Sequence, residues 1–314
     1  MSIRHLQTLT PVKNSPKYFD PETLAQIRPL SLRARTLIEG WLAGMHRSPL
    51  RGQSLEFSQH REYVPGDDMR QVDWKVFARS DKHYVRQYED ETTLTAMVLI
   101  DRSLSMDYRS QPQRLSKLDY ANLIACSLVY LITSQQDSVG LATVSSQVDD
   151  WLRPSSLPAQ LDTVFALLDQ PIQQPRTSGL ALALHQCAQR LNKPHLIVVL
   201  SDWLDDIEPT LQALKLLHCA GHDLLVMHLL DPWEVSFPFD QTCEFLGLEG
   251  NDSLVADPLL IAGAYRQAMA DLCRQFQMGC LSINCDYYRL LTDQSLSVSL
   301  SNLLAHRLLR GNRK

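Results

Sequence analysis

The sequence has no segment long enough to cross a membrane and no leader for secretion. Its longest apolar run, residues 123–132, is about ten residues long, whereas a membrane-spanning helix needs about 20. The N-terminal residues contain no apolar stretch of the kind that secretory signals carry. We therefore expect a protein that does not insert into membranes and that resides in the cytoplasm.

The sequence also lacks a cysteine framework. Its 7 cysteines are an odd number, and no two of them have C-x-x-C spacing. A disulfide scaffold is typically short, dense in cysteine and even in number. We expect these thiols to be reduced and mostly buried as small apolar side chains, and we expect no zinc site.

Charge of one sign is not in large excess either. The formal net charge is -5, and the isoelectric point is about 6.0. Dedicated nucleic-acid-binding domains are usually basic. The composition therefore disfavours nucleic acid as a partner.

Several motifs of common enzymes are missing. There is no G-x-x-x-x-G-K-[ST] loop for ATP, no G-x-S-x-G nucleophile elbow and no G-x-G-x-x-G after a strand. An aspartyl phosphatase would need a second acid two residues after Asp101, where Ser103 stands. We expect a protein that is not an enzyme. The alternative is a Mg²⁺-dependent phosphoryl-transfer or hydrolytic enzyme, for which Asp107 and Asp205 are the nearest candidate bases.

Strand and helix patterns alternate from residue 94 onward. Apolar runs predict strands, and periodic segments between them predict helices. This alternation is typical of a doubly wound, mostly parallel sheet with helices on both faces. We predict an α/β domain over residues 94–314, preceded by an N-terminal extension over residues 1–93 that contains helices and a small β-rich subdomain. The predicted strands are 94–100, 138–144, 195–200, 223–230 and 280–287, with 148–152 as a possible partner strand, and the predicted helices are 115–134, 157–168, 179–191, 209–219, 258–277 and 295–309.

Small oxygen-bearing side chains follow the predicted strands. Ligands of open parallel sheets bind at the carboxyl ends of the strands. Hydroxyls with one or two carboxylates, and no His or Cys, are a hard-oxygen set that suits Mg²⁺, with Mn²⁺ or Ca²⁺ also possible. The alternative is that these side chains only cap helices and loops. The predicted metal ligands are Asp101, Ser103, Ser105, Ser178 and Asp202, with Thr177 as an alternative to Ser178.

Two sets of residues resemble known families. The D-x-S-x-S sequence at Asp101, Ser103 and Ser105 resembles the metal-ion-dependent adhesion site of von Willebrand factor A domains. The block at residues 61–89, together with segments at 117–121, 137–141 and 201–205, resembles the bacterial domain-of-unknown-function fifty-eight family. This second resemblance extends over most of the chain.

The resemblance implies a von Willebrand factor A-like fold and a role as a protein-binding adaptor. Such proteins are associated with MoxR-type AAA+ ATPases, in assembly or chaperone-like activity. Many relatives carry two N-terminal membrane helices, which this sequence does not show. It also departs from the adhesion-site pattern, because Ser178 stands where Thr is usual and Trp203 where Gly is usual. Trp203 could shield the metal loop, and Arg102 could compete for its carboxylates.

The family-signature block carries many charges of both signs. A cluster of cations and aromatics could bind phosphate or nucleic acid, so the Arg61–Arg86 surface is an alternative functional site. The acids nearly match the bases, which favours a structural network of ion pairs. The signature residues are Arg61, Asp67, Asp68, Arg70, Asp73, Trp74, Lys75, Arg79 and Arg86.

Overall fold

The computed structural model describes most of the chain from residue 94 onward. It covers residues 94–170, 178–248, 253–296 and 298–300, and gives the backbone alone for residues 60–62 and 84–86. One compact unit of the chain is Ala43–Thr93. In it, β1 (His60–Glu62) pairs antiparallel with β2 (Tyr84–Arg86).

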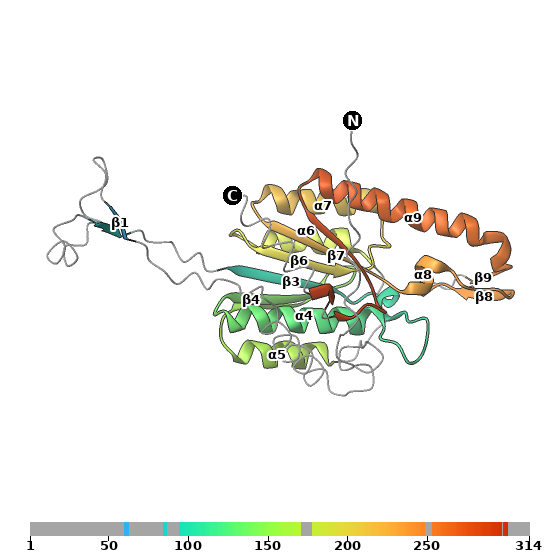
Figure 1. Cartoon of the computed structure of the whole chain (residues 1–314), viewed down its shortest axis with the longest axis horizontal. Helices are drawn as coiled ribbons and strands as arrows, with labels where there is room; N and C mark the ends of the chain where they lie inside the picture. The colour runs from blue at the N-terminus through green and yellow to red at the C-terminus, as the bar shows by residue number, and fades with distance from the viewer. Residues whose placement is uncertain are drawn as a thin grey trace. The chain divides into compact units, whose positions relative to one another are not determined.

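The main unit is built on one six-stranded sheet with the order β10-β7-β6-β3-β4-β5. All neighbours pair in parallel except β4 and β5, so β5 is an antiparallel edge strand. The chain order reverses between β3 and β6, which lie side by side in the middle of the sheet (Figure 1). Such a reversal is where open α/β sheets place their ligands. The strands are β3 (Thr95–Asp101), β4 (Ser138–Val144), β5 (Val148–Ser155), β6 (Leu196–Ser201), β7 (Asp223–Leu230) and β10 (Asp286–Leu291).

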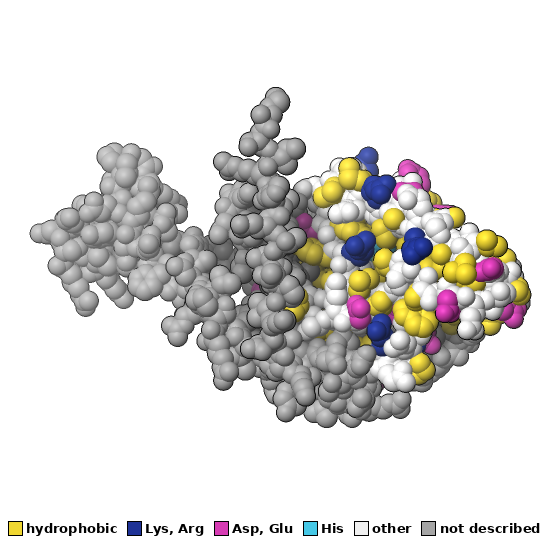
Figure 2. Space-filling model, turned by 45° about the vertical axis from the view of Figure 1, so that its right-hand side comes forward, with side chains coloured by type: hydrophobic (Ala, Val, Ile, Leu, Met, Phe, Trp, Pro, Cys, Tyr) yellow, Lys and Arg dark blue, Asp and Glu magenta, His cyan; other side chains and the backbone are white. Residues whose placement is uncertain are grey.

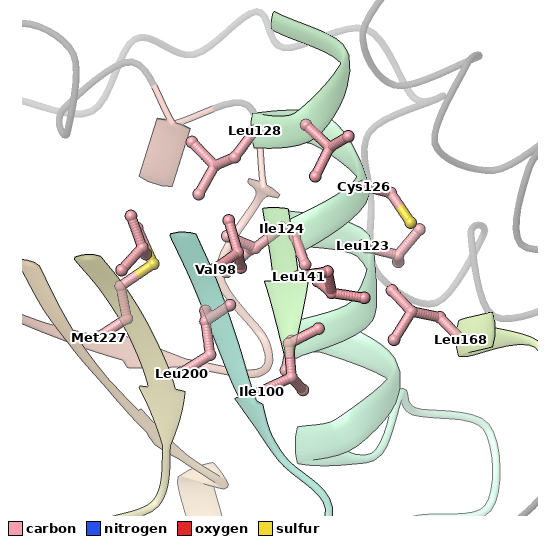
Figure 3. Close-up of a cluster of buried hydrophobic side chains, with 14 of the residues drawn as sticks. Val98, Ile100, Leu123, Ile124, Cys126, Leu128, Leu141, Leu168, Leu200 and Met227 are labelled. Carbon is pink, nitrogen blue, oxygen red and sulfur yellow. The ribbon is translucent and has the colours of Figure 1, made fainter. Parts of the chain in front are cut away.

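Helices cover both faces of this sheet. Strand side chains alternate between faces, so Val98 and Ile100 join one core while Met97 and Leu99 join the other. Figure 3 shows the first core, in which side chains of α4 meet those of β3, β4, β6 and β7. The predicted doubly wound α/β fold is confirmed. The helices are α4 (Lys117–Ser134) and α5 (Ala159–Leu168) on one face, and α6 (Leu180–Arg190), α7 (Ile207–Cys219) and α9 (Pro258–Ser282) on the other.

One predicted element is wrong, and three short elements between β7 and α9 were not predicted. The strand expected at 280–287 begins only at Asp286, because α9 continues to Ser282 and buries Cys280 in its last turn. Asn284, with a positive φ of 57°, then turns the chain. The unpredicted elements are α8 (Pro232–Ser236), β8 (Cys243–Leu246) and β9 (Ser253–Ala256). The predicted helix at 295–309 lies mostly outside the described residues.

None of the described helices combines the length and apolar content needed to cross a bilayer. All seven cysteines lie in the described part of the chain, none of them is in a disulfide, and five are buried. Burial raises the pKa of the Cys187 thiol to about 12, which keeps it protonated and unreactive.

Candidate functional site

Asp101 is the last residue of β3, and its buried carboxylate organises the loop that follows. Its Oδ1 accepts a hydrogen bond of 2.9 Å from the main-chain N–H of Ser103. Its Oδ2 accepts one of 2.6 Å from the hydroxyl of Ser201, at the end of β6. The hydroxyl oxygens of Ser103 and Ser105 lie 3.0 Å apart. The structure therefore brings the three oxygens of the D-x-S-x-S sequence together at the reversal point of the sheet.

Asp202, in the loop after β6, is a second buried carboxylate close to the first. Burial, and then the charge of Asp202, raise the pKa of Asp101 to about 7, although bonds from Ser201 and Ser103 oppose the shift. Two buried carboxylates that repel each other are costly unless a cation lies nearby. This part of the molecule is thus suited to positive charge.

Lys117 supplies one such charge from the first turn of α4. This helix begins at a capping box, in which Ser116 and Asp119 bond to each other's main-chain N–H groups. The buried ammonium of Lys117 donates to Asp202 Oδ2 at 2.8 Å and to Glu234 Oε1 at 2.5 Å. Burial lowers the pKa of Lys117, but the charges of Asp202 and then Glu234 outweigh burial, so its net shift is upward.

Glu234 comes from α8, which sequence reasoning did not predict. Burial raises the pKa of Glu234 in spite of the opposing charge of Lys117. One buried ammonium thus serves two carboxylates, while Asp101 bonds to Ser103 and Ser201. Neither Lys117 nor Glu234 stood out as a site residue in the sequence, although Lys117 lies in a segment that carries the family resemblance.

The remaining predicted ligand, Ser178, lies just before α6 and contacts the loop that follows β6. Ser178 donates to Asp205 Oδ2 at 3.4 Å, and the N–H of Leu180 donates to the same oxygen at 3.0 Å. Asp205 thereby caps the N-terminus of α6, which is a structural role. Thr177 lies outside the described residues. The other candidate base, Asp107, is exposed and bonds to Arg109.

Trp203 does not lie over the Asp101 loop. Its φ of 53° is left-handed, which explains why the adhesion-site pattern usually has Gly at this position. The ring is buried in the core against Phe276, with centroids 4.6 Å apart, and its N–H donates to the carbonyl of Met227. The guanidinium of Arg102 donates to the carbonyl of Gln170.

The donor set decides what kind of metal could bind. In the described part of the chain, no three side chains of the His, Cys, Asp and Glu types gather closely enough to hold an ion. A metal at Asp101 would therefore depend on serine hydroxyls and water. That chemistry fits Mg²⁺, which keeps several waters, and does not fit zinc.

His228 is buried on β7. Its protonation should make the stability of the protein depend on pH. Burial lowers its pKa to about 4, with Asp202 raising it and Lys117 and Arg289 lowering it. The unfolded chain, with a histidine pKa of about 6.5, binds the proton first as pH falls. Stability linked to His228 is therefore present above about pH 6.5 and is lost between about pH 6.5 and 4.

Urea unfolding at pH 7 and pH 5 measures the contribution of His228 to the free energy of unfolding. Between pH 7 and pH 5 the free energy of unfolding of wild type should fall by up to about 2 kcal/mol more than that of His228→Gln. The other titrating groups are common to both proteins, so this difference is due to His228. Equal losses in the two proteins would show that His228 is already protonated, or exposed, in the folded state.

The signature block cannot be placed at this site. Arg61 and Arg86 lie on the paired strands β1 and β2, in adjacent register positions. The other signature residues lie outside the described part of the chain. The alternative of a phosphate or nucleic-acid surface therefore stays a prediction.

Comparison with known proteins gives a family without an assigned function. Residues 59–272, more than half of the chain, match the family described as Protein of unknown function DUF58. Uncharacterized protein Rv1480 of Mycobacterium tuberculosis and Uncharacterized protein Mb1516 of Mycobacterium bovis are each 26% identical over 221 residues, which cover 70% of this chain and 68% of theirs.

Solved structures with a similar fold are more distant. Conserved hypothetical protein BatB from Bacteroides thetaiotaomicron is 18% identical, with a TM-score of 0.46, over 68% of this chain and 98% of that one. The SpRpn10 VWA domain is 12% identical, with a TM-score of 0.35, over 67% and 95%. Nothing about ligands or partners follows from these two proteins. The chain belongs to the DUF58 family, and its fold is a six-stranded, mostly parallel sheet with helices on both faces.

Proposed function

We propose that this protein is a non-catalytic binding module whose Asp101 site holds Mg²⁺ and, through it, a carboxylate of a protein partner. The observation that carries the proposal is the pair of buried carboxylates, Asp101 and Asp202, at the reversal point of the sheet, with Lys117 committed to Asp202 and Glu234. The cation that this arrangement favours would lie beside Asp101.

The residues present fit such an ion. Asp101, Ser103 and Ser105 would hold it, and Asp202, kept in place by Lys117, would act as the second carboxylate nearby. A divalent ion with few protein carboxylates retains electrophilic character. It would therefore accept an acidic side chain from a partner, which is adhesive rather than catalytic chemistry.

A MoxR-type AAA+ ATPase is the partner we propose, and this rests on the family resemblance alone. The free thiols of the described cysteines agree with a reducing compartment such as the cytoplasm. The ATPase itself requires Mg²⁺, so chelation would impair both proteins. Binding should therefore be compared between wild type and a metal-site variant at constant Mg²⁺.

Asp101→Asn is the variant that tests the metal site. Asparagine keeps the shape of the side chain and removes the charge that Asp202 repels. At pH 8 in EDTA the variant should unfold several degrees above wild type, because neutral groups are less costly to bury. Added Mg²⁺ should raise the midpoint of wild type by a few degrees, equivalent to ~2.7 kcal/mol at 100 times the Kd, and should leave that of the variant unchanged.

Asp162→Asn is the matched control, since Asp162 is an exposed aspartate on α5. It should respond to Mg²⁺ as wild type does, and it should retain the ATPase. If wild type shows neither a thermal shift nor heat of binding with Mg²⁺, Asp101 is only a loop cap and the proposed function is wrong.

A further inference from the structure

Residues 231–248 and 253–265 form a projection beyond the carboxyl end of the sheet, which we term the acidic projection. It consists of α8, β8, β9 and the start of α9, which lie together at one end of the main unit in Figure 1. An aromatic cluster holds these elements to one another. Phe237 stacks on Phe245 of β8 and on Tyr265 of α9, with ring centroids 5.5 and 4.4 Å apart, and Phe239 meets Phe245 edge to face.

The outer surface of the acidic projection is apolar to an unusual degree. Leu260 is 82% exposed and Leu259 is 70% exposed at the start of α9, where the helix begins with Pro258. Further exposed apolar side chains come from the hairpin of β8 and β9. Single apolar side chains are commonly exposed on monomeric proteins, but a cluster of them is typical of a surface that contacts another molecule. The hairpin residues are Leu246, Leu248, Leu254 and Val255.

The charge of the acidic projection limits the kind of partner that could bind to its apolar surface. No lysine or arginine occurs in the sequence between Lys215 and Arg266, whereas three acids of the acidic projection are exposed. Figure 2 shows hydrophobic and acidic side chains adjoining at the end of the molecule that carries these elements, with basic side chains nearer the middle. An anionic membrane or a nucleic acid would be repelled by this surface. The exposed acids are Asp240, Glu244 and Asp257, while Asp231 is buried and Glu234 pairs with Lys117.

We propose that the acidic projection binds a cationic amphipathic helix of a partner protein. Leucines on one face of such a helix would cover Leu259, Leu260 and the hairpin, and its lysines or arginines would meet the surrounding acids. This surface is distinct from the Asp101 site and does not need a metal. The two are linked in the structure by Glu234, which lies in the projection and pairs with Lys117.

A designed peptide tests the proposal on the full chain. The probe is a fluorescent 18-residue peptide of leucine and lysine patterned as an amphipathic helix, and its counterpart has glutamate in place of lysine. Wild type should bind the lysine peptide at least about tenfold more tightly than the glutamate peptide. It should do so equally in EDTA and in the Asp101→Asn variant, which separates this surface from the proposed cation site.

Matched variants separate specific binding from general attraction to an acidic protein. Asp240→Lys with Glu244→Lys should weaken binding of the lysine peptide by about tenfold. The exposed acids Asp162 and Glu208 lie on α5 and α7, so the double lysine variant there has the same net charge. It should bind nearly as wild type does.

The apolar part of the surface has its own control. The double variant Leu259→Ser with Leu260→Ser should weaken binding of the lysine peptide. The control variant Leu182→Ser with Leu281→Ser, at exposed leucines of α6 and of the far end of α9, should leave that binding unchanged. Equal weakening by test and control variants, or equal binding of both peptides, would overturn the proposal. So would binding to phosphatidylserine vesicles, or self-association that Leu259→Ser with Leu260→Ser abolishes.

Discussion

Replacing Lys117 by methionine should lower the free energy of unfolding by ~3–5 kcal/mol, which is the usual cost of removing one partner from a buried ion pair. The side chain of Lys117 is completely buried, and its ammonium bonds to Asp202 and Glu234. Methionine has nearly the same volume, so the loss would come from charge rather than from a cavity. Thermal or urea unfolding in EDTA at pH 8 measures it, and the midpoint should fall by roughly 10 °C.

Mg²⁺ should recover part of this loss, because an ion beside Asp101 would compensate the carboxylates that Lys117 leaves. Lys215→Met is the matched control, since Lys215 lies on α7 and is exposed. Its unfolding free energy should stay within about 0.5 kcal/mol of that of wild type.

Glu234→Gln in the Lys117→Met background completes a double-mutant cycle. Removal of the second carboxylate should restore stability, with a coupling of about 1–3 kcal/mol between the two positions. If Lys117→Met is as stable as wild type and the cycle shows no coupling, Asp202 and Glu234 are already neutral in the folded protein. The site would then not favour a cation.

Much of the main fold could be predicted from the sequence because each central strand is a nearly continuous apolar run. Residues 196–200 and 224–230 are buried on both faces of the sheet, so their sequences carry little else. The strand predicted at 280–287 was wrong for the same reason, namely that it was inferred from apolar character. Cys280 and Cys285 are both buried apolar side chains, but one belongs to a helix end and the other precedes a strand. Burial alone does not distinguish these two structures.

The candidate site could be predicted only where neighbours in the sequence are neighbours in space. Asp101, Ser103 and Ser105 lie on one short loop, and their spacing was enough to indicate them. Lys117 and Glu234 are 117 residues apart and meet through the packing of α4 and α8. No local pattern reveals such a pair. The short helix α8 was also missed, since only its Asp231 cap and Pro232 mark it.

Trp203→Gly should lower the free energy of unfolding by about 3 kcal/mol, although it restores the residue that the adhesion-site pattern usually has. Loss of a buried tryptophan typically costs 3–5 kcal/mol, through lost burial and the cavity that remains. Glycine would recover about 1 kcal/mol of this, because the φ of 53° costs a non-glycine residue strain. Trp203→Phe should lose less, since it keeps a ring against Phe276 and gives up only the N–H bond to Met227.

The effect of Trp203→Gly on Mg²⁺ binding separates two roles of this tryptophan. The ring packs in the core against Phe276, and the main-chain N–H of Trp203 bonds to Ser201, which in turn bonds to Asp101. A glycine at 203 retains that N–H and the left-handed backbone, so the Kd for Mg²⁺ should change by less than about threefold, or ~0.7 kcal/mol. Calorimetry below the lowered unfolding midpoint measures it. A much tighter Kd would mean that the tryptophan obstructs the ion, and this chain's departure from glycine would then weaken metal binding. An unchanged Kd would mean that the tryptophan serves the core, and that the backbone alone shapes the loop beside Asp101.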